Sequence, residues 1–299
     1  MDDMLIKVID DINNKKERGM YMKKFNKVLT TGLVVAASIL GFTQPVWAEG
    51  QFKGESVKVG VVSDNEVAVW EYVGEKAKEE GIDLEVVQFT DYIQPNEALA
   101  NGSLDLNAFQ HVAFLKEWND ANGGGLTDLG FTYVSPLGAY SEKVESLDKL
   151  EKGSTIAIPN DPTNGGRALL LLQQAGVIKV DEAVGVLATV DDITENPLDL
   201  KFEELDAAQV AISLADVDVA IINTNYAIDN GLTLEDAIFL DAEKPEQLKD
   251  EYKNIVAVRE EDKDNELYKH ILSLYQTKEV EEKIIEASSK ADVAAWTSK

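Results

Sequence analysis

The chain has 299 residues, a formal net charge of −27 at pH 7 and no cysteine. This length is sufficient for two lobes or domains, and the acidic charge argues against nucleic acid and anionic membrane surfaces as partners. The lack of cysteine excludes disulfides, thiolate metal sites, a cysteine nucleophile and lipid attachment through a cysteine.

The N-terminal region predicts an export signal behind an extension. Residues 1–21 are polar and charged, and we interpret them as a non-native or mis-called extension without a fold. Residues 22–48 have the pattern of a signal peptide: three lysines, the apolar stretch Val28–Phe42, and Val46-Trp47-Ala48 before a cleavage site ahead of Glu49. The apolar stretch is short of the roughly 20 residues that a membrane span needs. We therefore expect an exported, extracytoplasmic protein that is secreted or associated with the cell surface.

Strand and helix patterns alternate from the start of the mature chain. Strands are predicted at Val57–Val62, Leu84–Phe89 and Leu104–Phe109, and helices at Ala68–Glu80 and Ile93–Asn101. This rhythm predicts an α/β fold with a doubly wound parallel sheet. Ligands of such folds bind beyond the carboxyl ends of the strands.

A second set of strands and helices follows a possible crossing between lobes. Phe131–Tyr140 is predicted as one long strand that makes this crossing, and Asn254–Val258 as a strand that crosses back. The elements expected between the two crossings are strands at Thr155–Ile158, Leu200–Glu204 and Val217–Ile222 and helices at Pro162–Ala175 and Ala207–Ala215. Helices at Asp264–Tyr275, Lys278–Glu286 and Ala291–Trp296 are expected to complete the chain.

This order predicts two lobes, the second inserted in the first. Lobe 1 is expected to comprise 53–140 and 254–299, and lobe 2 is expected to comprise 141–253.

The turn after the strand Thr155–Ile158 has the features of an anion site. Asp161 is placed to cap the following helix, and Asn164 and Arg167 are three residues apart and share a helical face. The glycine pair between them allows another backbone or a ligand to come close. A helix N-terminus and a fork-shaped cation together suit a small carboxylate. The alternative is a capped helix whose arginine pairs with a local acid.

Other candidate side chains follow buried strands. Phe109 and His111 are expected to face a cleft, and the amides of Asn223-Thr224-Asn225 are able to bind an ammonium or a carboxylate. Tyr92, Tyr133 and Tyr226 are candidates for a pocket wall. His270 is expected on the surface of a charged helix, and two distant histidines without cysteine predict no metal site. No phosphate-binding loop, dinucleotide fingerprint or nucleophile elbow is present in the sequence, and no cofactor is expected.

Three motifs resemble the bacterial methionine-binding proteins of ABC importers. They are Asn107–Leu115 with its Phe-Gln-His, Ile158–Asn164 followed by Arg167, and Ile221–Ala227, and the similarity extends from about Val57 to Trp296. The resemblance implies a two-lobed periplasmic-binding-protein-like fold of type II. It also implies capture of methionine or a related amino acid and delivery to an ABC permease in the membrane.

The resemblance also implies roles for individual residues. Arg167 corresponds to the family's carboxylate ligand, and Asn223 or Asn225 corresponds to its amide contact with the amino-acid head group. The side-chain pocket is then formed by Tyr92, Phe109, His111 and Tyr133, with Asn254 as a weaker candidate. With Asn164 from the helix turn, the predicted ligand-binding set is Tyr92, Phe109, His111, Tyr133, Asn164, Arg167, Asn223, Asn225 and Asn254.

The sequence departs from the family pattern in two places, and it leaves alternative ligands and alternative classes of protein open. Phe42 stands where family members have a lipid-anchor cysteine, so no lipid anchor is expected, and Ser63–Val67 replaces a Thr-Pro-Gly-Pro-His-like turn with two added acids. The alternative ligands are a methionine-containing dipeptide or another apolar amino acid. The alternative classes are an enzyme on the same scaffold with His111 as base, and an adhesion or signalling protein that kept the fold.

Overall fold

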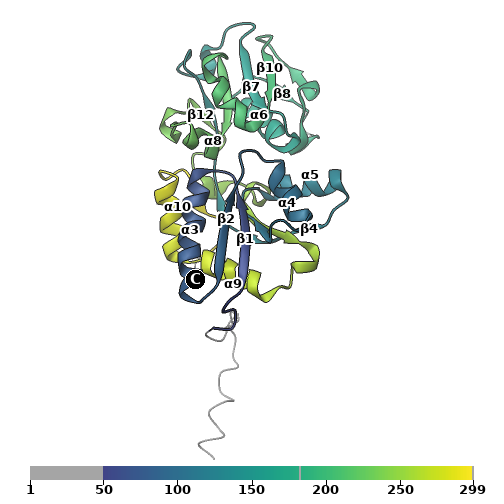
Figure 1. The fold of residues 1–299 in the computed structure, drawn as a ribbon. Helices are drawn as coiled ribbons and strands as arrows, with labels where there is room; N and C mark the ends of the chain where they lie inside the picture. The colour runs from purple at the N-terminus through teal and green to yellow at the C-terminus, as the bar shows by residue number, and fades with distance from the viewer. Residues whose placement is uncertain (1–49, 182, 298–299) are drawn as a thin grey trace, which may run out of the picture. The chain divides into compact units, whose positions relative to one another are not determined.

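The computed structural model describes residues 50–181 and 183–297, and the predicted extension and export signal lie outside the described residues. Two five-stranded sheets organise the described chain (Figure 1). The first sheet contains, in spatial order, β2 (Asp83–Gln88), β1 (Ser56–Val61), β3 (Leu106–Asn107), β13 (Ile255–Arg259) and β4 (Leu126–Phe131). The second contains β10 (Lys201–Leu205), β7 (Thr155–Pro159), β11 (Val219–Asn223), β6 (Leu137–Tyr140) and β12 (Phe239–Leu240).

Helices pack against both faces of each sheet. They are α3 (Asp64–Glu79), α4 (Gln94–Ala100), α5 (Val112–Asn122), α6 (Pro162–Gln174), α7 (Ala207–Val210), α8 (Thr224–Asp229), α9 (Glu266–Tyr275) and α10 (Lys278–Ala287). In β13, Val256 and Val258 pack with residues of α3, α9 and α10, whereas Ile255 and Ala257 pack with residues of α4 and α5. This alternation is the expected result of a strand buried on both faces.

The second sheet is buried in the same way. In β7, Ile156 and Ile158 join a core cluster with the leucines of α6, and Ala157 joins a separate cluster with residues of α7 and α8. The predicted α/β architecture with two sheets is therefore confirmed.

One strand in each sheet departs from the predicted parallel arrangement. β6 runs antiparallel to β11 and β12, and β13 runs antiparallel to β3 and β4. Both strands come directly after a crossing. A chain that leaves one sheet at its carboxyl edge and crosses to the facing carboxyl edge of the other has to enter that sheet in the reverse direction.

The predicted long strand Phe131–Tyr140 is three strands. β4 ends at Phe131, β5 (Tyr133–Val134) pairs with β14 (Val293–Ala294), and β6 already belongs to the second sheet. We therefore place the first crossing at Ser135 and Pro136, before the boundary predicted at residue 140. A small separate ribbon is formed by β8 (Lys179–Val180) and β9 (Ile193–Glu195).

Two further expectations near the C-terminus are wrong. The predicted helix at Ala291–Trp296 contains β14 instead, because Ala294 and Val293 pair with β5. His270 is buried rather than exposed: its Nε2 lies 2.7 Å from a carboxylate oxygen of Glu80, and its ring packs against Phe52. Within the described ranges, no helix has the length and apolar character needed to cross a membrane.

Candidate functional site

One pocket lies where the carboxyl ends of the strands in the two sheets meet. It encloses about 460 Å³ of space not occupied by protein atoms, a volume that includes space open to solvent. All nine residues predicted to bind a ligand line it. The described lining residues are Tyr92, Phe109, Gln110, His111, Phe114, Tyr133, Ser135, Pro136, Asn164, Arg167, Asn223, Thr224, Asn225 and Asn254.

The strand order explains why these residues converge. In the first sheet β2 and β3 lie on opposite sides of β1, and in the second β10 and β11 lie on opposite sides of β7. The connections after such strands diverge and leave a crevice at the carboxyl edge. The turns after β3, β7 and β11 supply most of the lining, and the two crossings supply Ser135 and Asn254.

A buried amide network fixes the turn between β3 and α5. The side-chain nitrogen of Gln110 donates to the side-chain oxygens of Asn96 and Asn107 at 2.6 and 2.9 Å, and Asn107 donates to Asn96 at 2.8 Å. All three side chains are buried, and their hydrogen bonds are made with one another and with the carbonyl of Pro95. The turn that presents Phe109 and His111 is thereby held rigidly.

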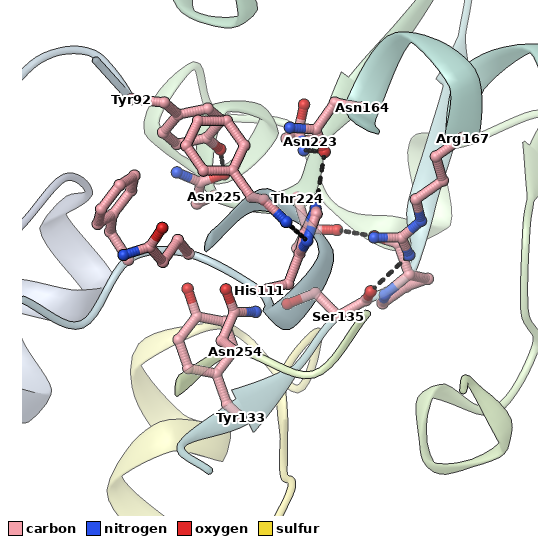
Figure 2. Close-up of a pocket in the computed structure, with 14 residues that line it drawn as sticks. Tyr92, His111, Tyr133, Ser135, Asn164, Arg167, Asn223, Thr224, Asn225 and Asn254 are labelled. Carbon is pink, nitrogen blue, oxygen red and sulfur yellow. Dashed lines mark hydrogen bonds between the residues drawn. The ribbon is translucent and has the colours of Figure 1, made fainter. Parts of the chain in front are cut away.

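His111 is a neutral hydrogen-bond donor to the pocket wall. Its Nδ1 caps α5 by accepting from the backbone N–H of Phe114 at 3.1 Å, which places the proton of the neutral ring on Nε2. Nε2 lies 3.4 Å from Oδ1 of Asn164 (Figure 2). Burial, together with the nearby charge of Arg167, lowers the pKa of His111 to about 3.

A relay of side-chain amides begins at the cap of α6. Asp161 accepts the backbone N–H of Asn164 at 2.9 Å and its side-chain N–H groups at 3.0 and 3.1 Å, as the predicted capping role requires. Oδ1 of Asn164 therefore faces the pocket side, where it accepts from Nδ2 of Asn223 at 2.9 Å (Figure 2). Oδ1 of Asn223 is buried and has no partner among the described residues. The relay thus presents an unused acceptor.

Arg167 is held by contacts from three different segments. Its Nε donates to Asp241 at 2.7 Å, its Nη2 donates to the carbonyl of Ser135 at 3.0 Å, and its guanidinium lies 4.5 Å from the ring centre of Tyr252. The arginine does pair with an acid, as the alternative interpretation holds, but this acid is remote in sequence and the arginine still lines the pocket. The glycine pair serves the backbone here, because a Cβ at Gly166 would lie 2.0 Å from the carbonyl oxygen of Val186.

Aromatic rings form the opposite wall of the pocket. The ring of Tyr92 lies 5.8 Å from that of Phe109 and 6.0 Å from that of Phe114, which are distances typical of packed aromatic pairs. Tyr226 does not line the pocket; it packs behind Tyr92 at 4.9 Å. The hydroxyl of Tyr92 donates to Oδ1 of Asn225 at 2.6 Å, so a residue that follows the first sheet's β2 contacts a residue of α8 beside the second sheet.

We expect Tyr92→Phe to weaken ligand binding about five-fold, because it removes the hydrogen bond to Asn225 and keeps the aromatic wall. Calorimetry on the variant and on Tyr72→Phe checks this. Tyr72 lies against Lys76 on α3 and lines a different surface hollow, so its variant is expected to bind like the unchanged protein. Equal weakening in the two variants would contradict a specific role for the Tyr92 hydroxyl.

Acidic groups stand behind the pocket wall. Tyr133 donates to Glu66, which also accepts the backbone N–H groups of Val62 and Ser63 at the start of α3. Burial raises the pKa of Glu66. Asp64 and Glu66 are the two acids of the turn Ser63–Val67, which differs from the family pattern. Neither of them lines the pocket.

Sequence reasoning missed five lining residues and two supporting ones. Gln110, Phe114 and Thr224 lie inside motifs already singled out, and Ser135 and Pro136 lie at the crossing. Asp241 and Tyr252 carry no sequence signal, because only the fold brings them to Arg167. Among the described residues, no cluster of three or more potential metal-ligating side chains occurs.

Comparisons with known proteins identify relatives of this chain. The family model "NlpA lipoprotein" matches residues 57–296. The D-methionine-binding lipoproteins MetQ of Yersinia pestis and Escherichia coli are 45% and 44% identical over 245 residues, which are 80% of this chain and 88% of each relative. A nutrient-binding protein from Burkholderia cenocepacia, solved bound to methionine, is 45% identical with a TM-score of 0.76, over 80% of this chain and all of that one.

A second solved structure extends the range of relatives. The substrate-binding protein of a methionine transporter from Streptococcus pneumoniae is 38% identical with a TM-score of 0.76, over 81% of this chain and 96% of that one. The resemblance inferred from the three sequence motifs is confirmed by these matches. The chain belongs to the NlpA lipoprotein family.

Proposed function

We propose that this protein is an extracytoplasmic substrate-binding protein of an ABC importer, and that it binds methionine between its two sheets. The observation that carries the proposal is the pocket itself. It joins one guanidinium, a buried amide oxygen that has no partner in the described part of the chain, and an aromatic wall. Relatives at about 45% identity over most of the chain are named for methionine binding.

Each part of the pocket suits one part of an amino acid. A guanidinium has five N–H donors, and Arg167 uses two of them on Asp241 and Ser135, so its remaining donors are available for the ligand carboxylate. Oδ1 of Asn223 is an acceptor for the α-ammonium. The rings of Phe109 and Tyr92 offer the sulfur–aromatic contacts that a thioether favours.

The chemistry of His111 supports binding rather than catalysis. A general base needs a pKa near the working pH and a free lone pair. The pKa of His111 is lowered to about 3, and its only lone pair in the neutral ring caps α5. An enzyme that uses His111 as base is therefore the weaker proposal.

The route of export and the mode of retention stay predictions. The relatives are named lipoproteins, whereas the predicted signal peptide and Phe42 lie outside the described residues. Delivery of the bound amino acid to a membrane permease follows from membership of an importer system and is part of the proposal.

Isothermal titration with L-methionine, D-methionine, leucine and a methionine-containing dipeptide tests the proposed function. Ligand carried over from the expression host is first removed by unfolding and refolding, and mass spectrometry identifies it. We expect a methionine enantiomer to bind most tightly and to be recovered chemically unchanged. Tighter binding of the dipeptide or of leucine would show that this compound, rather than methionine, is the ligand. Recovery of a chemically altered ligand would favour the enzyme alternative.

A further inference from the structure

Asp241 contacts Arg167 but does not line the pocket. Its side chain and that of Arg167 are 9% and 6% exposed, and the Nε–Oδ2 distance is 2.7 Å. The other carboxylate oxygen of Asp241 accepts the backbone N–H of Leu137 at 2.8 Å, and its own N–H donates to the Leu137 carbonyl at 3.0 Å. The carboxylate is therefore fixed to the β6–β12 ladder before any ligand binds.

This anchoring fixes the guanidinium. Asp241 engages Nε, and the carbonyl of Ser135 engages Nη2, while the ring of Tyr252 covers one face of the guanidinium. The remaining N–H groups belong to the two Nη atoms. A carboxylate in the pocket consequently meets a donor pair whose direction is set by Asp241 rather than by the ligand.

The same contact fixes the charge of the site. Arg167 is the only side chain with a full charge among the described lining residues, since His111 is neutral. Asp241 balances that charge at hydrogen-bond distance. Two further acids, the half-buried Asp161 and the buried Glu66, accept hydrogen bonds from Asn164 and Tyr133 and add no positive charge. A ligand with net negative charge therefore meets no uncompensated cation.

We infer that Asp241 is the residue by which this site selects ligands without net charge, that is, zwitterionic amino acids over the corresponding anionic acids. The inference rests on the proposed function. Asp241 acts through Arg167 and is a positioning and specificity-determining residue. Its removal has two separable effects: looser positioning of Arg167, which weakens every carboxylate ligand, and loss of a balancing charge, which favours anions.

A pair of ligands separates the two effects. Methionine and its hydroxy-acid analogue share the carboxylate and the thioether, but the analogue has a hydroxyl in place of the ammonium and is an anion. We expect unchanged protein to prefer methionine, and Asp241→Asn to reduce that preference roughly tenfold. The negative charge of Asp241 attracts the ammonium that only methionine carries, whereas its repulsion of the shared carboxylate cancels in the ratio of the two affinities. Calorimetric dissociation constants for both ligands give the ratio, which a purely structural defect leaves unchanged.

Two variants and the unchanged protein complete the design. Asp218→Asn is the matched control, because Asp218 also accepts a backbone N–H in the second sheet, that of Thr155, but does not contact Arg167. Asp241→Ser, which keeps an acceptor for the Leu137 amide, replaces Asp241→Asn if circular dichroism shows that the latter is unfolded. If neither variant folds, the test uses the two dissociation constants of the unchanged protein. Equal affinity for methionine and the hydroxy acid overturns the inference.

The outcomes also separate this inference from the proposed function. No methionine binding by the unchanged protein would refute the proposed function. Methionine binding with the same ligand ratio in Asp241→Asn as in the unchanged protein would refute the role of Asp241 alone.

Discussion

Replacing Arg167 by methionine is expected to weaken binding of the amino acid by about 2–5 kcal/mol, or roughly thirty-fold to several thousand-fold. The side chain lines the pocket and is nearly fully buried, so the ligand carboxylate would lose the one cation among the described lining residues, in a site shielded from water. Methionine at position 167 keeps much of the aliphatic length of the side chain, so the loss of affinity measures the contribution of the guanidinium. Titration calorimetry on the refolded, ligand-free variant measures it.

The same substitution is expected to destabilise the fold, because it leaves the carboxylate of Asp241 buried without its partner. The double variant Arg167→Met, Asp241→Asn removes both charges and is expected to recover much of the stability but none of the affinity. Chemical denaturation and calorimetry on the pair separate these effects.

Arg259→Met is the matched control for Arg167→Met. Arg259 is also partly buried and donates to the carbonyls of Leu99 and Leu104, but it lies outside the pocket. Its variant is expected to lose stability and keep its affinity. An affinity for methionine that changes less than about two-fold in Arg167→Met would contradict the proposed site.

Local rules were sufficient to predict most elements and the position of the site. Apolar patterns fix the strands β1 and β7, most of whose residues are buried, and Asp161 with Pro162 fixes the start of α6. Because ligands of α/β sheets bind at carboxyl edges, the residues after these strands were the natural candidates. They meet in one pocket for this reason.

Features that depend on distant parts of the chain could not be predicted. β6 and β13 run antiparallel to their neighbours because the chain crosses between the facing carboxyl edges of the two sheets. No local sequence pattern contains this information. Asp241 is one of 55 acidic residues, and its sequence neighbours do not distinguish it from the rest. His270 has charged neighbours in sequence, yet its own face of α9 packs on Phe52 and is buried.

The second large effect concerns a buried carboxylate beside the first crossing. Asp292 accepts the hydroxyl of Ser135 at 2.5 Å and the side-chain N–H of Asn65 at 2.9 Å. Burial, reinforced by the charge of Glu66, raises the pKa of Asp292 to about 7. The folded state therefore binds a proton more tightly than the unfolded chain, and the stability due to this group is present at about pH 4 and lost as the pH rises through about 7.

Asp292→Asn is expected to remove this pH dependence. Asparagine is uncharged throughout, and its side-chain oxygen is able to accept from the side-chain N–H of Asn65 as the carboxylate does. The variant is expected to match the unchanged protein near pH 4 and to exceed its free energy of unfolding by up to about 4 kcal/mol near pH 8, at about 1.4 kcal/mol for each unit of pKa difference.

The comparison between variants isolates Asp292 from other titrating groups. The lowered pKa of His111 makes stability rise with pH between about 3 and 6.5, in the opposite sense, and this contribution is common to both proteins and cancels in their difference. Denaturant titrations across this pH range, with the exposed Asp83→Asn as control, measure the difference. If Asp292→Asn is less stable than the unchanged protein near pH 8, the carboxylate is ionised and stabilising there. Ser135 would then be held at the crossing by a charge rather than by a neutral acid.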